Sequence, residues 1–430
     1  MQEHFRSAKG KKRTQPSANV PIDFCFGPTP SFHKTDMCRC NGKGRLFLSL
    51  FLLGFGFLGF IKQGSLIMPW QLGEPATRTT NKDLARIMNN GSALDSINHQ
   101  LPLCNRSQLQ HGKWISEILP QAPYKTNYEI KCNAITVNGT SRFKDYQWQP
   151  TDHKSCDFSR WNATLFCQLA RNAPIAVLGD SLSWEMFLSL VEPFVENFGN
   201  GQSMHNLQMQ AMKIPIVQAI CNGTTPVIFK RTDDLADIQH IIRGGFFPSI
   251  LILNRGSHFV PDDQLEKELR VTFAHVKEWL QVCQQREITC HFYWRTTVPG
   301  HAYCTSFSEP VNNFTFMEEW VASNPVSRGH VSFRWHEFHY QNDLVLELLE
   351  SMFAGETKEV SRHEWAPPPY RILDAYHINL LRPDQHHHKD DCLHSCAPGK
   401  VSVYNRLLLH WLRMDRTVYY QEYSTNISHS

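Results

Sequence analysis

The chain has 430 residues, which is enough for one large domain or two smaller ones. Its 43 basic and 40 acidic residues leave a formal net charge of +3. This balance is too even for a typical nucleic-acid-binding protein, so we expect no nucleic acid among its partners.

The first marked segment is a 16-residue apolar run without charges, Leu46–Ile61. As a helix it would reach roughly 24 Å, a little less than a ~30 Å hydrocarbon core, which suits a thin early-secretory membrane. A cleaved signal peptide is the alternative, but the 45 preceding residues are long for the segment before such a core. We therefore predict a retained transmembrane anchor over 46–61.

Charge predicts the orientation of this anchor. Residues 1–45 carry nine Lys or Arg against three Asp or Glu and lack apolar periodicity. We interpret them as a disordered cytosolic tail, because basic flanks stay on the cytosolic side. Residues 62–430 would then lie in a lumen as a single-pass type II protein, with 62–103 as a polar stem.

The positions of the N-glycosylation sequons and of most cysteines support a luminal location for the residues after the apolar run. Seven N-glycosylation sequons all follow the apolar run: Asn90, Asn105, Asn138, Asn162, Asn222, Asn313 and Asn426. Ten cysteines also follow it: Cys104, Cys132, Cys156, Cys167, Cys221, Cys283, Cys290, Cys304, Cys392 and Cys396. An even number permits up to five disulfides in an oxidising compartment, although the sequence leaves their pairing open.

Residues 104–170 hold four of these cysteines and three tryptophans without a long helix signal, which predicts a small disulfide-tied subdomain. Residues 171–415 alternate strand and helix patterns, and 416–430 form a C-terminal tail. The expected strands are Ile175–Leu178, Pro215–Val217, Val227–Lys230, Ile250–Leu253 and Ile288–Trp294. The expected helices are Trp184–Glu196, Gln264–Gln284, Leu344–Ala354 and Val403–Leu412. This alternation predicts an α/β fold with three α/β/α layers and a central parallel sheet.

The motif Gly179-Asp180-Ser181 follows the apolar run 174–178 and precedes an amphipathic run, 184–194. Strand, sharp turn and helix together present a serine hydroxyl at the carboxyl edge of a parallel sheet. Alone the motif is weak, because an ordinary turn whose Asp or Ser caps a helix has the same sequence.

Asp391 and His394 stand three residues apart far downstream. A serine nucleophile needs a base, and that base needs an orienting group. We therefore predict Ser181 as nucleophile, His394 as base and Asp391 as orienting carboxylate. Asp384 and His386 form a rival Asp/His element with a less favourable spacing.

The residues expected around the oxyanion and the substrate are Gly179, Asp180, Asn254, Gly256 and Arg295. The backbone N–H of Ser181 is one natural donor at a helix start. Asn254 and Gly256 follow a strand at the same sheet edge, although Asn254 could simply end that strand. Arg295 could bind an acidic substrate group or form a structural ion pair.

Two further patterns surround the predicted base. Cys392 and Cys396 flank His394, so disulfides would fix the loop that carries it. The run 386–388 of three histidines could suggest zinc. Adjacent histidines rarely all face one ion, and no further cluster has ligand spacing, so we predict no metal site.

The motifs and their order along the chain resemble those of the trichome birefringence-like polysaccharide O-acetyltransferases, within the PC-esterase or GDSL/SGNH-hydrolase-like group. The resemblance covers roughly 104–412 and rests on seven ordered segments. These are Gly112-Lys-Trp114 with Tyr146–Pro150 and Cys156-Asp-Phe158, Gly179–Ser183, Asn254-Arg-Gly256, Arg295–Pro299 with His301, Arg382-Pro-Asp384 with His386, Asp391–His394 with Cys396, Pro398 and Gly399, and Asn405.

The resemblance implies a Golgi type II membrane protein that transfers acetyl to sugar hydroxyls through an acyl-enzyme, with Ser181, His394 and Asp391 in the catalytic roles. It implies an acetyl donor as co-substrate, either acetyl-CoA or an acetylated intermediate, and no bound cofactor. The chain departs from the plant pattern at Trp184, Arg255, Ser257, Ser395 and Tyr404, which we expect to line the site. It is therefore identified as a divergent member.

The expected function is a membrane-anchored O-acetyltransferase that acts on a glycan or polysaccharide. An acetyl esterase would use the same chemistry with water as acceptor, and exclusion of water decides between the two. A glycan-binding Golgi protein with an inactive triad is the third interpretation.

Overall fold

The computed structural model describes residues 101–116, 136–137, 140–141, 146–195, 198, 204–324, 333–354, 369–388, 391–395 and 401–428. The chain divides into two units, Met1–Thr79 and Thr80–Ser430, and every described residue belongs to the second. The predicted cytosolic tail, the anchor over 46–61 and most of the stem lie outside the described residues. Within the described ranges, no helix combines the length and apolarity needed to cross a membrane.

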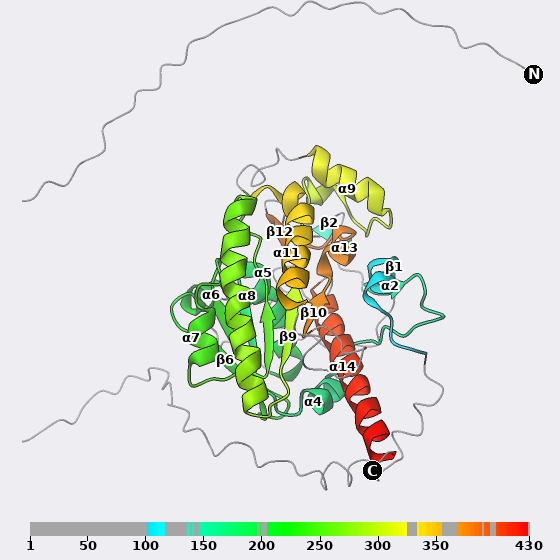
Figure 1. The fold of residues 1–430 in the computed structure, drawn as a ribbon. Helices are drawn as coiled ribbons and strands as arrows, with labels where there is room; N and C mark the ends of the chain where they lie inside the picture. Colours follow the sequence, from blue (N-terminus) through cyan, green and yellow to red (C-terminus); the bar gives the residue numbers. More distant parts are fainter. Residues whose placement is uncertain are drawn as a thin grey trace, which may run out of the picture. The chain divides into compact units, whose positions relative to one another are not determined.

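The centre of this second unit is a six-stranded sheet (Figure 1). Its strands are β5 (Ile175–Gly179), β6 (Ile216–Ile220), β7 (Thr225–Arg231), β8 (Ile250–Leu253), β9 (His291–Arg295) and β10 (Tyr370–Leu373), in the spatial order β10-β9-β8-β5-β7-β6. Neighbours from β10 to β7 are parallel. The carboxyl ends of β5, β8 and β9 therefore meet at one edge of the sheet, where ligands bind in folds of this kind.

Strand β6 runs antiparallel to β7, so the expectation of a wholly parallel sheet needs correction. The two strands are joined by a tight turn in which Cys221, Asn222 and Gly223 all have positive φ values. Asn-Gly between two apolar runs is a strong hairpin signal, because both residues tolerate the left-handed backbone that such turns require. This signal was present in the sequence and fixes the direction of the edge strand.

Alternate residues of the strands face two separate hydrophobic clusters. Ile175 and Val177 of β5 belong to one cluster, while Ala176 and Leu178 belong to the other. The first face is covered by α4 (Ala163–Ala170), α5 (Ser181–Val191), α6 (Met204–Ala211) and α14 (Ser402–Ser428). The second is covered by α7 (Ile238–Arg243), α8 (Asp262–Gln285) and α11 (Phe338–Phe353). Because side chains of a strand alternate between faces, this gives the α/β/α layering that the sequence predicts.

Helix α8 shows why these segments fold as they do. Its buried residues include Leu265, Leu269, Phe273 and Val276, which are spaced three or four positions apart and form one apolar stripe. Helices α8 and α11 pack against each other over the second face (Figure 1). Helix α14 continues to Ser428, well beyond the predicted end at Leu412.

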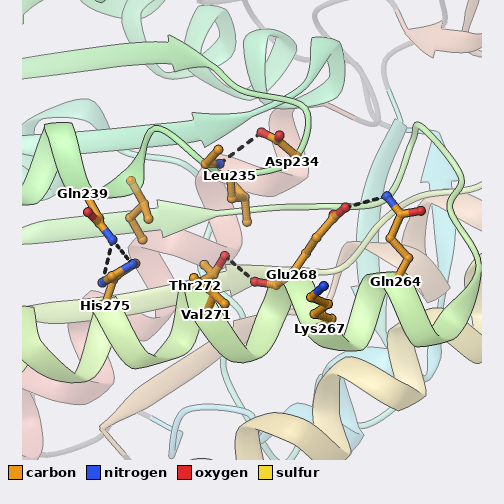
Figure 2. Close-up of a pocket in the computed structure, with 11 residues that line it drawn as sticks. Asp234, Leu235, Gln239, Gln264, Lys267, Glu268, Val271, Thr272 and His275 are labelled. Carbon is orange, nitrogen blue, oxygen red and sulfur yellow. Dashed lines mark hydrogen bonds between the residues drawn. The ribbon is translucent and has the colours of Figure 1, made fainter.

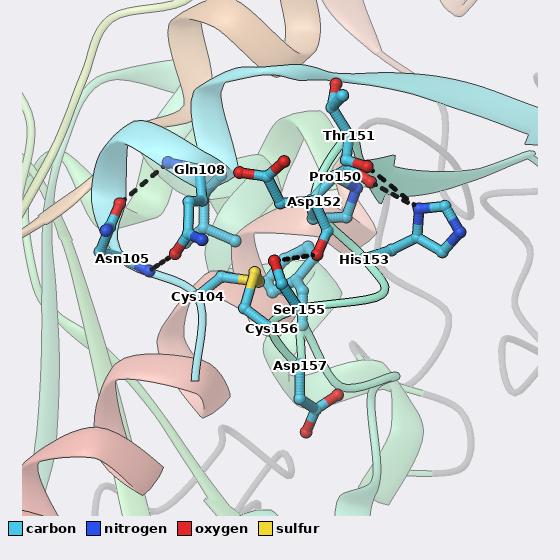
Figure 3. The surroundings of a disulfide bond; sticks show 12 residues. Cys104, Asn105, Gln108, Pro150, Thr151, Asp152, His153, Ser155, Cys156 and Asp157 are labelled. Carbon is cyan, nitrogen blue, oxygen red and sulfur yellow. Dashed lines mark hydrogen bonds between the residues drawn. A yellow bond between two sulfur atoms is a disulfide. The ribbon is translucent and has the colours of Figure 1, made fainter. Parts of the chain in front are cut away.

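The segment before β5 folds around a small antiparallel pair, β1 (Gly112–Ser116) with β4 (Tyr146–Pro150). The Cys104–Cys156 disulfide ties the start of helix α2 (Arg106–Gln110) to the loop after β4 (Figure 3). The indoles of Trp114 and Trp148 pack edge to face with ring centroids 5.8 Å apart. Both side chains belong to the first hydrophobic cluster, so this segment shares its core with the sheet. Two further short strands, β2 (Thr136–Val137) and β3 (Thr140–Ser141), pair in this segment.

Four disulfides pair eight of the ten predicted cysteines: Cys104–Cys156, Cys167–Cys221, Cys283–Cys290 and Cys304–Cys392. Cys132 and Cys396 lie outside the described residues. The disulfides confirm the prediction of a disulfide-containing fold and add pairings that the spacing left open.

Four of the predicted sequon asparagines lie exposed on the described surface, namely Asn105, Asn162, Asn222 and Asn313. Asn105, Asn162 and Asn313 cap α2, α4 and α9 (Phe314–Ser323) through their side-chain oxygens. Asn90 and Asn138 lie outside the described residues, and Asn426 lies in α14.

Candidate active site

Ser181 is the first residue of α5 and directly follows the turn at the carboxyl end of β5. Asp180 caps this helix, because its side-chain oxygen accepts the backbone N–H of Leu182 at 2.9 Å. An N-cap aspartate fixes where the helix begins and complements the positive end of its dipole. The turn therefore presents Ser181 at the sheet edge, as the motif predicts.

The structure brings Ser181, His394 and Asp391 together. The hydroxyl of Ser181 lies 2.7 Å from Nε2 of His394, and Nδ1 of His394 lies 3.0 Å from Oδ2 of Asp391. Asp391 and His394 belong to β12 (Asp391–Ser395), which pairs with β11 (His386–His388). The side chain of His394 keeps 29% of its surface exposed, whereas Ser181 is only 7% exposed. A bound group can therefore reach the pair from the solvent side.

The charges around His394 strongly favour its protonated form. Burial alone would lower the pKa of His394, but the hydrogen bond to Asp391 and the negative charges of Glu185, Asp391 and Asp180 raise this pKa to about 9. A base with this environment binds a proton tightly and stabilises the imidazolium that forms when serine is deprotonated.

Asp180 also belongs to a buried polar network behind the serine. Its second carboxylate oxygen accepts the backbone N–H of Ser257 at 3.1 Å and the Ser257 hydroxyl. Burial would raise the pKa of Asp180, but the positive charge of Arg295 and the Ser257 hydrogen bond hold the pKa below its ordinary value. Asp180 is therefore an ionised carboxylate that locks the turn to the loop after β8.

The side-chain amide of Asn254 is hydrogen-bonded within the protein and is not oriented as an oxyanion donor would be. Both hydrogens of its amide are engaged, one with the carbonyl of Arg295 at 2.9 Å and one with the Thr297 hydroxyl at 3.0 Å. Its oxygen accepts from the Arg295 guanidinium at 2.7 Å. Asn254 thus supports the site from behind, while the N–H of Ser181, as the first residue of a helix, has no acceptor within the helix and remains the natural oxyanion donor.

Arg295 is a buried cation whose guanidinium contacts other residues of the protein. Besides Asn254, its guanidinium donates to the Ser183 hydroxyl at 3.2 Å and lies over the Tyr404 ring at 5.1 Å from the centroid. With 0% of its surface exposed, it does not present its charge to a substrate.

Gly179 and Gly256 allow the backbone to approach its neighbours closely at this edge. A Cβ on Gly179 would lie 2.3 Å from the Ser183 hydroxyl oxygen and 2.7 Å from the Asn254 carbonyl, at a φ of +147°. A Cβ on Gly256 would lie 2.2 Å from the Thr297 hydroxyl oxygen. Both positions therefore need glycine for the close packing of this turn.

We expect Gly179→Ala to lower the free energy of unfolding by roughly 3 kcal/mol or more, since backbone strain and overpacking act together. Chemical denaturation of the purified protein measures this change. Gly223→Ala is the matched control, because Gly223 also has a positive φ of +83° but no atom within 4 Å of the added carbon. Equal losses in the two variants would contradict the close-approach argument.

The rival pair, Asp384 and His386, lies in a separate network. Asp384 is buried against Arg382 in a double hydrogen bond of 2.8 and 3.0 Å. The ring of His386 donates to the carbonyl of His394 at 3.1 Å and lies 2.8 Å from Nδ1 of His301. His386 thereby braces the strand that carries His394. In the described part of the chain, no group of three or more His, Cys, Asp or Glu side chains could hold a metal ion.

A disulfide fixes the Asp391–His394 segment from the other side. Cys392 is bonded to Cys304, and its carbonyl accepts the backbone N–H of His301 at 2.9 Å. The sequence predicts that disulfides near His394 fix this loop, and the partner of Cys392 is now Cys304. Cys396 lies outside the described residues.

The positions that depart from the plant pattern do not line an open surface, which corrects that expectation. Trp184, Arg255, Ser257, Ser395 and Tyr404 are each at most 4% exposed. Trp184 packs against aromatic rings of the core, and Arg255 pairs with Glu268 at 3.0 Å. These departures therefore change the frame around the site and not the surface that meets an acceptor.

Sequence reasoning missed Glu185, one helical turn after Ser181. Its carboxylate is 3% exposed and accepts the backbone N–H of Ser395 at 2.7 Å. The signal was a single charged residue in α5, four positions after the serine, since such a residue shares the helix face of Ser181.

A pocket of about 500 Å³ lies between α7 and α8, away from these residues (Figure 2). Its lining includes Asp234, Gln239, Lys267, Glu268 and His275. The figure shows Gln239 directed at His275. The Gln264 amide donates to Glu268 at 2.8 Å. Neither Ser181 nor His394 lines this pocket, so it is not part of the candidate site.

No protein-family model matches the chain. Among curated proteins, it is 24% identical to Protein YLS7 of Arabidopsis thaliana over 71% of this chain and 70% of that protein. It is 24% identical to Protein trichome birefringence-like 23 of Arabidopsis thaliana over 71% and 80%, and 21% identical to Xyloglucan O-acetyltransferase 4 of Populus trichocarpa over 63% and 71%. These similarities confirm the resemblance drawn from the motifs. The chain is a divergent relative of the trichome birefringence-like proteins.

Proposed function

We propose that the protein is a glycan O-acetyltransferase, and that Ser181, His394 and Asp391 form its catalytic triad. The observation that carries the proposal is the 2.7 Å contact between the Ser181 hydroxyl and Nε2 of His394, with Asp391 on the opposite ring nitrogen. The kinship with proteins named as polysaccharide acetyltransferases supports acetyl as the group transferred and a polysaccharide as acceptor.

In this proposal, the Ser181 oxygen attacks the carbonyl carbon of an acetyl ester or thioester while its proton moves to Nε2 of His394. The helix-terminal N–H of Ser181 stabilises the oxyanion. The carbon–oxygen or carbon–sulfur bond to the leaving group breaks, and that group takes the proton from His394. A sugar hydroxyl then gives its proton to His394 and attacks the acetyl-serine. The bond between the acetyl carbon and the Ser181 oxygen breaks, and that oxygen takes the proton back from His394.

This mechanism predicts a steep pH dependence. His394 must be unprotonated to accept the serine proton, and its pKa is raised to about 9. As the pH rises toward that value the base form grows, so kcat/KM should rise about tenfold per pH unit and then level off. A pH–rate profile with an acetyl ester measures this, and a flat profile between pH 6 and pH 9 would contradict His394 as the base.

A partition experiment separates transfer from hydrolysis. The purified protein is incubated with an acetyl ester, with and without an added polysaccharide. A transferase moves acetyl to the polysaccharide and releases less acetate when the polysaccharide is present. An esterase releases acetate that the polysaccharide cannot divert, and an inactive glycan-binding protein releases none and is not labelled at Ser181 by a serine-directed phosphonate.

The cellular setting belongs to the same proposal. We place the protein in the Golgi membrane as a type II protein, with 46–61 as anchor and 62–430 in the lumen. Four disulfides and four exposed sequon asparagines support an oxidising, glycosylating compartment. Microscopy of a tagged chain, with glycosidase sensitivity as a second readout, tests this placement.

A further inference from the structure

We infer that Glu185 is a positioning residue, which anchors the strand carrying His394 to the helix carrying Ser181 and places a second negative charge beside the His394 imidazole. The inference rests on the proposed role of His394 and deepens it. Asp391 alone is the orienting carboxylate that the motif predicts, so Glu185 adds a group that the motif does not contain.

The first step is geometric. Ser181 and Glu185 are one turn apart on α5, so their side chains lie on the same face of the helix. Oε1 of Glu185 accepts the N–H of Ser395, the residue after His394, at 2.7 Å. A hydrogen bond to a buried carboxylate is among the stronger ones, and it joins the nucleophile helix directly to β12.

The second step concerns charge. Glu185 is 3% exposed, so solvent screens its charge weakly. The largest charge effects on His394 come from Glu185, Asp391 and Asp180, all of them acidic, while His386 contacts the His394 backbone carbonyl. The charge of Glu185 raises the pKa of His394 together with the Asp391 hydrogen bond, against the opposing effect of burial.

Two substitutions separate the two actions. Glu185→Gln keeps a side-chain oxygen for the Ser395 N–H but removes the charge. Glu185→Ala removes both. Glu192→Gln is the matched control, because Glu192 is also a buried glutamate at the end of the same helix, and its charge is not among the three charges with the largest effect on the pKa of His394.

The pKa of His394 can be measured independently of enzyme activity. Slow deuterium exchange at the imidazole Cε1–H, followed by peptide mass spectrometry of the full-length protein across pH, gives the midpoint for His394. We expect this midpoint to fall by about one pH unit in Glu185→Gln and to stay unchanged in Glu192→Gln. An unchanged midpoint in Glu185→Gln would overturn the electrostatic part of the inference, whether or not the protein proves to be an acetyltransferase.

Kinetics with an acetyl ester test the anchoring part. In Glu185→Gln the acid limb of kcat/KM should move to lower pH with the midpoint. In Glu185→Ala the plateau of kcat should fall about tenfold below that of the Gln variant with little change in KM, because the base is no longer held against the nucleophile. Equal plateaus in the Gln and Ala variants would overturn the anchoring role. If Glu185→Ala fails to fold while Glu185→Gln folds, the side-chain oxygen at position 185, charged or not, is what anchors the strand.

Discussion

Replacing Ser181 by alanine should lower the rate of acetyl transfer by at least ~10³-fold, and His394→Ala should do the same. The Ser181 variant lacks the oxygen that carries the acetyl group. The His394 variant lacks the imidazole that accepts the proton of the Ser181 hydroxyl. Combining both substitutions should cost little more than either alone, since the two groups act as a unit. Steady-state rates with an acetyl ester and a polysaccharide acceptor measure these effects.

Ser183→Ala is the matched control for Ser181→Ala. Ser183 stands two residues further along the same helix, is buried, and points its hydroxyl at Arg295 and not at His394. Its removal should change the rate by less than about tenfold. A loss in Ser183→Ala as large as that in Ser181→Ala, or near-normal turnover in Ser181→Ala, would contradict the assignment of the nucleophile.

Asp391→Asn should reduce kcat by roughly 10³- to 10⁴-fold, because the amide no longer fixes the tautomer of His394 or stabilises its imidazolium. The carboxylate of Asp391 also accepts the backbone N–H groups of Leu393 and His394 at 3.2 and 3.0 Å. One amide oxygen can still accept such bonds, so we expect the fold to survive. Turnover and thermal unfolding should be measured on the same sample.

Asp157→Asn controls for the loss of an ion-paired carboxylate. The Asp157 side chain is 34% exposed, against 25% for Asp391, and pairs with Arg413 at 2.7 Å. This control should keep nearly all activity. Comparable kcat values for Asp391→Asn and Asp157→Asn would remove Asp391 from the triad and reopen the alternative pair.

The layered fold could be predicted because its signals are strong and local. Short apolar strands such as Ile250–Leu253 and a long amphipathic helix at 264–284 lie close to where the structure has β8 and α8. Strand β10 was missed, because Tyr370–Leu373 has only two apolar buried residues, Ile372 and Leu373, and so lacks the continuous apolar run of β8. The antiparallel direction of β6 cannot be predicted from its apolar pattern and depends on the Asn222-Gly223 turn, which is a hairpin signal.

The three reactive side chains could be predicted from the motifs, but their surroundings could not. A sequence does not report which way an amide points, so the engagement of Asn254 with Arg295 and Thr297 came from the structure. Contacts such as Glu185 with Ser395 join residues 210 positions apart, and no local pattern encodes them. The pairing of Cys304 with Cys392 likewise depends on the tertiary fold.

The central claim is that Ser181 carries the acetyl group between donor and acceptor. The most direct measurement is mass spectrometry of the Ser181 peptide after brief incubation with an acetyl donor and rapid acid quenching. We predict an acetyl group on Ser181, absent from the His394→Ala protein and lost when a polysaccharide acceptor is added before quenching. Acetylated product that forms while the Ser181 peptide stays unmodified at every time point would contradict the account.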